Sequence, residues 1–236
     1  MNLMVLAGGF GTRLQTAALG VPKALAPVGD TPFLQLQIQH WIAQGVRSFV
    51  FLLYHQADQI IEFLEACHDD LLRGCSVSWT IEPQPMETGG AIAYAVRSQG
   101  LHGDFLATNA DTWLGGGIRE LCESVAPAVA VLHVDDIARY GEVLYDANAS
   151  VMKFLEKDGR QKAGWINAGL YRLNSKLFDR WNGSPMSLER DIFPQLASRG
   201  VLKAVPVMAD FVDIGLPDDY ERFCVWARTG RGEALL

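Results

Sequence analysis

A short apolar run that ends in a glycine-rich turn opens the chain and constrains its fold most. The run from Asn2 to Ala7 is apolar enough to form a buried strand, and the sequence reads LAGGFGTRL from Leu6 to Leu14. Because glycine reaches backbone conformations closed to other residues, Gly8, Gly9 and Gly11 allow a sharp turn with the amides pointing outward. Such a turn can hold a phosphate group; the alternative is a tight turn without a ligand.

The glycine spacing separates this turn from two common nucleotide-binding loops. It does not follow GxGxxG, and it lacks the GK[ST] ending of a Walker loop. Arg13 and Lys23 can add positive charge to the turn, which a polyphosphate would need because the chain has a formal net charge of −7. That acidic balance argues against nucleic-acid binding, which usually shows a basic excess.

The composition is that of a globular protein. The chain has 236 residues, of which 49% are hydrophobic and 20% are charged, so we expect a substantial core without disulfides. The four cysteines form no CxxC pair and no ligand spacing with histidine, which argues against zinc and dithiol chemistry. The first strand begins without a basic leader, and no apolar run approaches membrane-spanning length. We therefore expect a cytoplasmic protein with no membrane contact.

Strand-like and helix-like segments alternate through the first half. The expected strands are Asn2 to Ala7, Val46 to Tyr54, Ser76 to Glu82 and Asp104 to Thr108, and the expected helices are Thr31 to Gln44, Ala57 to Cys67 and Gly89 to Arg97. Thr31 is the expected cap of the first helix, with Pro32 at its first position and Gly45 at its end. This alternation predicts a parallel sheet covered by helices on both faces.

The second half contains shorter strand-like runs. These are Val129 to Val134, Glu142 to Tyr145, Val151 to Leu155 and Trp165 to Arg172, with helices near Ser187 to Ser198 and Pro217 to Trp226. No linker or repeat divides the chain, so we expect one α/β domain over residues 1–236, with functional lobes over about 1–110 and about 111–236. Trp181 and Trp226, if exposed, can form a contact in a homo-oligomer; the alternative is ordinary packing.

Two acids stand at positions where ligands bind in α/β folds. Asp111 follows an apolar strand, and a carboxylate there can hold Mg²⁺ or simply cap the turn. Asp213 interrupts the apolar strand from Phe211 to Ile214. Because an uncompensated buried carboxylate is costly, Asp213 should meet a metal, a basic side chain or several amides. Asp218 and Asp219 are expected in the first turn of a helix, where they favour its dipole.

Three further polar residues have two interpretations each. Glu156 and Lys157 can grip one ligand together, or they can be a solvated surface pair. Asn167 lies in the apolar stretch WINAGLY, where its amide can bind a sugar hydroxyl or the backbone.

Over nearly its whole length the chain resembles the sugar nucleotidyltransferases, also called nucleoside diphosphate sugar pyrophosphorylases. The resemblance rests on LAGGFGTRL with Pro22 and Lys23, METGGA from Met86, NADT around Asp111, RYG from Arg139, Glu156 with Lys157, NAGLY from Asn167 and DIGLPDDY from Asp213. Among members that lack a C-terminal left-handed β-helix, the chain most resembles the heptose 1-phosphate guanylyltransferases, a likeness that SLERDIFPQL followed by FVDIGLPDDY supports. Ala110 and Glu87 depart from the family, which often has glycine at both positions.

The resemblance implies a fold and a reaction. The fold is a Rossmann-like, mixed and mainly parallel sheet flanked by helices, of the glycosyltransferase-A-like nucleotidyltransferase type, without a C-terminal β-helix. Residues 1–110 would then bind the nucleotide and residues 111–236 the sugar phosphate. The reaction joins a nucleoside triphosphate, GTP, to a sugar 1-phosphate, D-glycero-α-D-manno-heptose 1-phosphate, and releases pyrophosphate.

The resemblance also implies roles for residues. The catalytic residues would be Arg13 at the departing pyrophosphate, Lys23 at the triphosphate, and Asp111 and Asp213, which would hold Mg²⁺. The nucleotide contacts would be Leu6, Gly8, Gly9, Gly11, Thr12, Glu82, Thr88 and Gly89. The sugar phosphate contacts would be Gly141, Glu156, Lys157 and Asn167.

Two other functions stay open. One is a uridylyl- or cytidylyltransferase for another sugar or alcohol phosphate. The Glu82 carboxylate, which only accepts hydrogen bonds, favours guanine with its two adjacent donors, although uracil and thymine also offer one N–H. The other is a nucleotide-sugar sensing module without turnover. The joint presence of the charged residues argues against a sensor, since a non-catalytic relative could lose any of Arg13, Lys23, Asp111, Lys157 and Asp213.

Overall fold

The computed structural model describes residues 1–11, 20–155 and 159–229. Thr12, Arg13, Glu156 and Lys157 lie outside the described residues. By its contacts the chain divides into two compact units. The first unit comprises Asn2–Gln84, Asn109–Gly115 and Asp210–Leu236, and the second comprises Pro85–Thr108 and Gly116–Ala209 together with Met1. Each unit contains chain from both sides of residue 110, and the division into nucleotide and sugar lobes stays a prediction.

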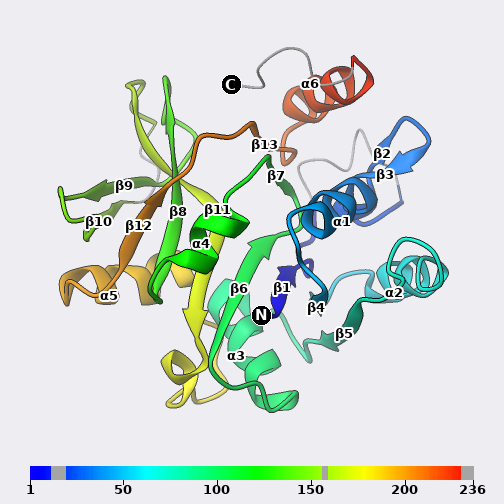
Figure 1. Ribbon diagram of the computed structural model, residues 1–236, viewed down its shortest axis with the longest axis horizontal. Helices are drawn as coiled ribbons and strands as arrows, with labels where there is room; N and C mark the ends of the chain where they lie inside the picture. The colour runs from blue at the N-terminus through cyan, green and yellow to red at the C-terminus, as the bar shows by residue number, and fades with distance from the viewer. Residues whose placement is uncertain (12–19, 156–158, 230–236) are drawn as a thin grey trace. The chain divides into compact units, whose positions relative to one another are not determined.

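The first unit contains a parallel sheet. Strand β1 (Leu3–Leu6) pairs in parallel with β4 (Ser48–Leu53), and β4 pairs in parallel with β5 (Ser76–Ile81). Helices α1 (Phe33–Ala43) and α2 (Ala57–Ala66) connect the strands (Figure 1). The last five residues of β4 are buried, as expected where both faces of a parallel sheet are covered. The predicted strands, helices and parallel pairing of this region are confirmed.

The start of α1 differs from the prediction. Thr31 does not cap the helix, because β3 (Thr31–Pro32) pairs antiparallel with β2 (Pro27–Val28). The helix begins at Phe33, whose N–H donates to the carbonyl of Ala26 at 2.9 Å. A backbone contact therefore replaces the side-chain cap at this end of the helix.

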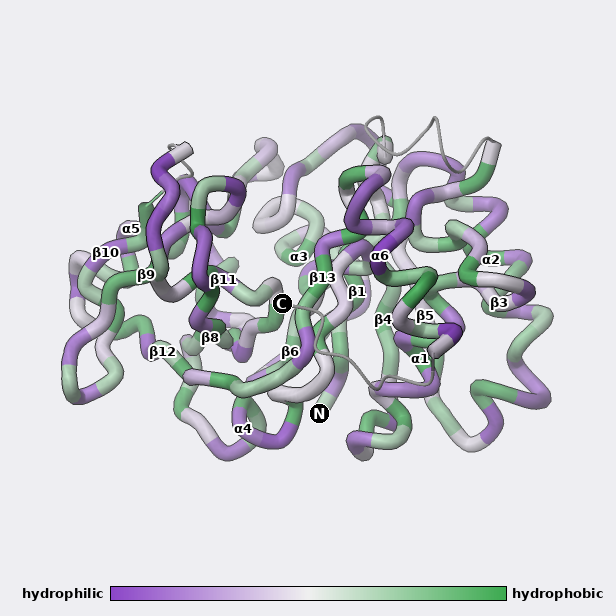
Figure 2. The backbone as a smooth tube through the Cα atoms, turned by 90° about the horizontal axis from the view of Figure 1, so that it is seen from above, coloured by the Kyte–Doolittle hydropathy of each residue, from purple (hydrophilic) through white to green (hydrophobic). Residues whose placement is uncertain are grey.

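The C-terminal part of the first unit packs against α1. Strand β13 (Phe211–Asp213) pairs antiparallel with β7 (Thr112–Leu114), and α6 (Pro217–Arg228) follows. Hydrophilic and hydrophobic residues alternate along α6 (Figure 2). Its buried side joins an apolar cluster, which includes Phe33, Trp113, Val212, Phe223 and Trp226. Trp226 is therefore packed in a core and not exposed, while Asp218 and Asp219 lie in the first turn of α6 as predicted.

Tyr220 on α6 should make stability depend on pH in the alkaline range. Its hydroxyl donates to the carbonyl of Pro27, and burial raises the pKa of Tyr220 from 10.0 to about 12. Above about pH 10 the unfolded chain ionises this tyrosine and the folded chain does not, so the free energy of unfolding should fall until about pH 12. Urea melts from about pH 9 to 12 should show a shallower fall in Tyr220→Phe than in the wild type. Equal slopes would contradict this assignment.

A mixed sheet forms the second unit. Its central strand β11 pairs antiparallel with β6, β8 and β9, while β10 pairs with β9 and β12 runs parallel to β8. The strands are β6 (Asp104–Asn109), β8 (Ala128–Val134), β9 (Glu142–Tyr145), β10 (Val151–Leu155), β11 (Gly164–Asn174) and β12 (Lys203–Pro206). The first five were predicted within two residues at either end, and β12 was not predicted.

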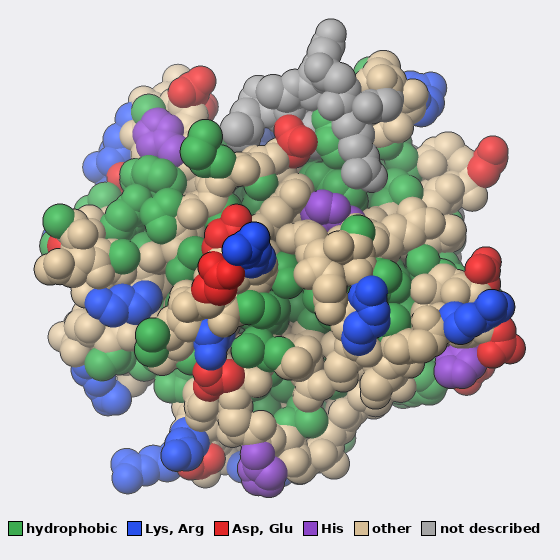
Figure 3. All heavy atoms as spheres, in the orientation of Figure 1, with side chains coloured by type: hydrophobic (Ala, Val, Ile, Leu, Met, Phe, Trp, Pro, Cys, Tyr) green, Lys and Arg blue, Asp and Glu red, His purple; other side chains and the backbone are tan. Residues whose placement is uncertain are grey.

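The helices of the second unit include short pieces. They are α3 (Glu87–Ser98), α4 (Ile118–Glu123), the 3₁₀-helix η2 (Ser175–Phe178), the π-helix η3 (Leu188–Ile192) and α5 (Phe193–Ser198). The single helix predicted over Ser187 to Ser198 is thus divided, and Pro194, which lacks an N–H, lies in the first turn of α5. Basic and acidic side chains lie side by side over α4 (Figure 3), where Arg119 pairs with Glu123 at 2.9 Å.

Trp181 in the second unit is buried. Its indole N–H donates to the carbonyl of Ser184 at 2.8 Å, and the Arg97 guanidinium lies 4.8 Å from its ring centre. Ordinary packing, the alternative interpretation, accounts for this tryptophan.

Two absences concern only the described part of the chain. None of the helices there has the length and apolar character that crossing a membrane requires. After β12 the described residues form only β13 and α6, with no β-helix.

Candidate functional site

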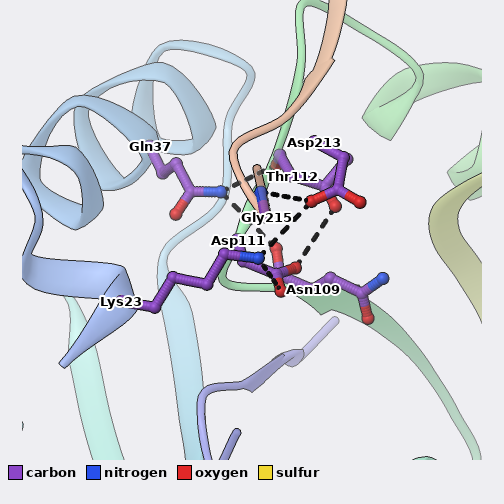
Figure 4. Close-up of polar contacts among 7 residues, drawn as sticks. All are labelled: Lys23, Gln37, Asn109, Asp111, Thr112, Asp213 and Gly215. Atoms are coloured by element: carbon purple, nitrogen blue, oxygen red, sulfur yellow. Dashed lines mark hydrogen bonds and ion pairs between the residues drawn. The ribbon is translucent and has the colours of Figure 1, made fainter. Parts of the chain in front are cut away.

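Lys23, Asp111 and Asp213 meet in the first unit. Lys23 begins the short helix η1 (Lys23–Leu25), Asp111 precedes β7, and Asp213 ends β13. Because β7 and β13 are antiparallel, with Asp213 opposite Thr112, the two acids come to the same end of this ribbon. The Lys23 ammonium lies 2.7 Å from Asp111 Oδ2 and 3.4 Å from Asp213 Oδ1 (Figure 4). One cation thus contacts both carboxylates.

The charges of this cluster leave room for a second cation. The side chain of Lys23 is 11% exposed, whereas those of Asp111 and Asp213 are 42% and 34% exposed. Two carboxylates facing one ammonium leave one net negative charge, and carboxylate oxygens are the ligands that Mg²⁺ prefers. In the described part of the chain no three His, Cys, Asp or Glu side chains gather to hold a metal.

Asp213 has the compensation that its place in an apolar strand required. Its Oδ1 accepts a hydrogen bond from the Gly215 N–H at 2.8 Å, besides the contact with Lys23. A Cβ at Gly215 would lie 2.8 Å from that oxygen and 2.9 Å from Lys23 Nζ. Glycine is therefore needed here to let the backbone approach the carboxylate.

Gln37 is a buried polar side chain that the sequence motifs do not indicate. It lies on α1, is 1% exposed, and donates through Nε2 to the carbonyl of Thr112 at 2.9 Å and of Asn109 at 3.5 Å (Figure 4). These two carbonyls flank Asp111, so Gln37 fixes the turn that carries the acid. An amide on the otherwise apolar face formed by Leu34 and Ile38 was the signal that could have found it.

The glycine turn lies against Glu82 and Lys23. A Cβ at Gly8 would lie 2.9 Å from Glu82 Oε1, and a Cβ at Gly11 would lie 3.1 Å from the Cβ of Lys23. Gly11 also has a φ of 59°, a conformation that favours glycine. Glu82 itself is buried, and its N–H donates to the carbonyl of Leu53 at 2.8 Å. Glu82, the predicted base contact, and Lys23, the predicted phosphate contact, therefore both lie against the glycine turn.

Two more predicted nucleotide contacts, Gly9 and Leu6, lie at or next to this turn, and Ala110 is hydrogen-bonded to one of them. Gly9 is exposed, and apart from its chain neighbours no atom of the described residues lies within 4 Å of an added Cβ. The carbonyl of Leu6 accepts the N–H of Ala110 at 3.0 Å. The Ala110 methyl is buried, so the fold accommodates a side chain at this position.

Thr88 and Gly89 lie at the start of α3 in the second unit. The Thr88 hydroxyl accepts from the Leu188 N–H at 2.8 Å and donates to Glu189 Oε2 at 2.7 Å. A Cβ at Gly89 would lie 3.0 Å from the carbonyl of Met186. Both residues therefore face η3 and the segment before it, and the Thr88 hydroxyl is engaged within the protein.

The backbone of Glu87 adopts a left-handed conformation. Its φ is 59°, in the left-handed region that glycine enters without steric cost. Glu87 is also ion-paired with Arg190 at 2.5 Å.

Gly141 and Asn167 are neighbours in the second unit. The Asn167 N–H donates to the carbonyl of Gly141 at 3.2 Å. The Asn167 side chain donates to Tyr171 Oη at 2.9 Å and accepts from the Gly169 N–H at 3.0 Å. The amide therefore has a backbone partner, one of the two alternatives considered for it. Glu156 and Lys157 fall outside the described residues.

The comparisons with known proteins agree with the resemblance. A profile described as "Nucleotidyl transferase" matches residues 2–225. A probable mannose-1-phosphate guanylyltransferase 1 of Oryza sativa subsp. japonica is 32% identical over 228 residues, which cover 93% of this chain and 63% of the relative. A mannose-1-phosphate guanylyltransferase catalytic subunit beta of Drosophila melanogaster is 28% identical, over 92% and 60%. The chain thus spans less than two thirds of the length of these relatives.

Solved structures extend the agreement to the fold. HddC from Yersinia pseudotuberculosis matches with a TM-score of 0.83 and 33% identity, over 95% of this chain and 98% of HddC. The same protein complexed with GMP-PN matches with a TM-score of 0.81. The predicted mixed, mainly parallel α/β fold flanked by helices is confirmed. Since the profile covers nearly the whole sequence, the chain belongs to the nucleotidyl transferase family.

Proposed function

We propose that this chain is a sugar-1-phosphate guanylyltransferase. The observation that carries the proposal is the convergence of Asp111 and Asp213 on Lys23 beside the glycine turn. The names of the guanylyltransferase relatives and the GMP-PN complex of HddC support GTP as the nucleotide. In the reaction, a phosphate oxygen of the sugar 1-phosphate attacks the α-phosphorus of GTP, and the bond to pyrophosphate breaks.

Charge neutralisation and positioning would supply most of the catalysis. The attacking phosphate oxygen is already ionised, so no serine, cysteine or histidine must be activated. Asp111 and Asp213 would hold Mg²⁺, which neutralises phosphate charge when it is bound. Lys23 would bind the triphosphate. Arg13 at the pyrophosphate and Lys157 at the sugar phosphate are proposed from the sequence resemblance alone.

Replacing Glu82 by Gln should reduce the preference for guanine. A carboxylate accepts both adjacent N–H donors of guanine, whereas an amide offers one acceptor and one donor. We expect kcat/KM for GTP to fall about tenfold or more, the loss typical of a hydrogen bond to a charged group, with a smaller change for UTP and CTP. Glu123→Gln, which changes an exposed acid on α4, is the matched control. An unchanged ratio of GTP to UTP in Glu82→Gln would remove Glu82 from base selection.

The sugar is proposed from the sequence resemblance to be D-glycero-α-D-manno-heptose 1-phosphate. Mannose 1-phosphate is the competing substrate, because the curated relatives are named for it. A matrix of triphosphates against sugar 1-phosphates with Mg²⁺, read by mass spectrometry, decides the nucleotide and the sugar together. It also tests a uridylyl- or cytidylyltransferase. Absence of pyrophosphate release with every pair would favour a sensing module instead. We also propose that the protein is cytoplasmic.

A further inference from the structure

The Glu189 carboxylate in the second unit receives three hydroxyl groups, and no role has been assigned to it. Its Oε2 accepts from Thr88 Oγ1 at 2.7 Å and from Ser187 Oγ at 2.9 Å. Its Oε1 accepts from Tyr171 Oη at 3.2 Å. These donors come from α3, from the residue before η3, and from β11, so one side chain ties together three separate parts of the unit.

The direction of each hydrogen bond is fixed. Each of the three hydroxyls also accepts an N–H: Thr88 from Leu188 at 2.8 Å, Ser187 from Arg190 at 3.2 Å, and Tyr171 from Asn167 Nδ2 at 2.9 Å. A hydroxyl has one proton to donate, and an ionised carboxylate can only accept. Three chains of hydrogen bonds, through Thr88, Ser187 and Tyr171, therefore all end on the Glu189 carboxylate. Hydrogen bonds to a charged group are stronger than bonds between neutral groups.

The hydrogen-bond chain through Tyr171 sets the orientation of the Asn167 amide. Asn167 Oδ1 accepts from the Gly169 N–H at 3.0 Å, and Nδ2 donates to Tyr171, whose own proton goes to Glu189. Reversing the amide would place an oxygen against the Tyr171 oxygen and a nitrogen against the Gly169 N–H. Asn167 Oδ1 is therefore held toward the Gly169 N–H, and the second N–H of the amide is what Asn167 can offer to a ligand.

The hydrogen-bond chain through Thr88 holds the start of α3. Thr88 is tied both to Glu189 and to the backbone of η3, and the Gly90 N–H donates to the carbonyl of Met186 at 2.8 Å. These bonds fix the turn that contains Glu87 and Gly89. The same carboxylate thus supports a proposed nucleotide segment and a proposed sugar contact.

We propose that Glu189 is a positioning residue for both substrates. Through Tyr171 it makes Asn167 present an N–H donor to an oxygen of the sugar phosphate, and through Thr88 it holds the start of α3 for the nucleotide. This inference rests on the proposed function, because it takes the roles of Asn167 and Thr88 from it. Glu189 itself would touch neither substrate.

Variants that interrupt one hydrogen-bond chain at a time test the proposal. Tyr171→Phe keeps a fully buried ring, whose centre lies 5.1 Å from that of Phe193, and removes only the hydroxyl. We expect its KM for the sugar phosphate to rise about tenfold, as for one lost hydrogen bond of the charge-assisted kind, with the Kd for GTP unchanged in calorimetry. Thr88→Val should raise the Kd for GTP more than it changes the KM for the sugar phosphate. Thr88→Ser, which keeps the hydroxyl, should lose less affinity for GTP than Thr88→Val. Glu189→Gln should shift both constants.

The controls separate positioning from stability. Glu123→Gln, an exposed acid outside the network, should change neither constant, and thermal melting of every variant reports its folding. If Tyr171→Phe or Glu189→Gln lowers the melting temperature while both constants stay within twofold of the wild type, Glu189 has a structural role and the proposal is wrong. If Tyr171→Phe does not fold, the response of both constants in Glu189→Gln decides.

The proposed function fails in a different way. A wild-type chain without turnover on any substrate pair contradicts the guanylyltransferase assignment and the positioning role with it. Normal wild-type turnover combined with unchanged constants in the variants contradicts the positioning role alone.

Discussion

Asp111→Asn should lower turnover by about two orders of magnitude or more, comparable to the loss of a group that stabilises transition-state charge. Asparagine keeps the size of the side chain and one carbonyl oxygen, but it removes the charge that faces Lys23 at 2.7 Å. With Asp213 as the remaining carboxylate, the divalent ion would lose half of its protein charge. Because the Asp111 side chain is 42% exposed, we expect little change in the free energy of unfolding.

Pyrophosphate release measured over a range of Mg²⁺ concentrations checks this expectation. Asp136→Asn is the control, since Asp136 is an exposed acid whose Oδ1 accepts the Ala138 N–H in a turn at 2.9 Å. The control should retain wild-type turnover. Wild-type activity in Asp111→Asn would remove Asp111 from the mechanism, and a similar loss in both variants would show that the assay reports a general charge effect.

Lys23→Met should also lower turnover by about two orders of magnitude, because it removes a cation from a site that stabilises phosphate charge. Methionine preserves much of the apolar stem of this mostly buried side chain. The variant differs from Asp111→Asn in its metal binding. The ammonium and a divalent ion compete for the same two carboxylates, so without Lys23 the binding of Mn²⁺ alone should become tighter, whereas Asp111→Asn should weaken it.

Calorimetric titration with Mn²⁺, without nucleotide, distinguishes the two variants. Lys203→Met is the matched control, because Lys203 donates to Ser150 Oγ at 2.9 Å in the second unit and belongs to no proposed site. It loses the same charge and should leave both turnover and metal binding as in the wild type. Weaker Mn²⁺ binding in Lys23→Met would contradict the arrangement of one lysine between two acids.

Much of the fold was predictable from local pattern. The apolar run of β4 and the alternation of strands with helices predicted the parallel sheet, because a strand covered on both faces must be apolar along its whole length. The start of α1 was predicted wrongly. Thr31 has the chemistry of a helix cap, but it pairs with Val28, three positions earlier, in a hairpin whose turn is Gly29 and Asp30. Two such turn residues are a local hairpin signal, which competes with the cap interpretation of Thr31.

The sequence predicted which residues form the candidate site better than it predicted which of them contact one another. Resemblance to the family selected Lys23, Asp111 and Asp213, and an acid in an apolar strand indicated that Asp213 needed a partner. That partner is a lysine 190 positions away. Gln37 and Glu189 were not predicted, because each contacts residues that are distant in the sequence. Gln37 donates to a carbonyl beside Asp111, and Glu189 accepts from the hydroxyls of Thr88 and Tyr171.

The sequence by itself determined the class of fold, the positions of most strands and helices, and the family. These depend on periodicity, on glycine and proline conformations and on short motifs, all of which act over a few residues. Only the tertiary structure decided which groups meet: one ammonium between two carboxylates, and one carboxylate at the end of three hydroxyl chains. The physical reason is that hydrogen bonds and ion pairs act over a few ångströms in space, whereas residues far apart along the chain reach that distance only when it folds.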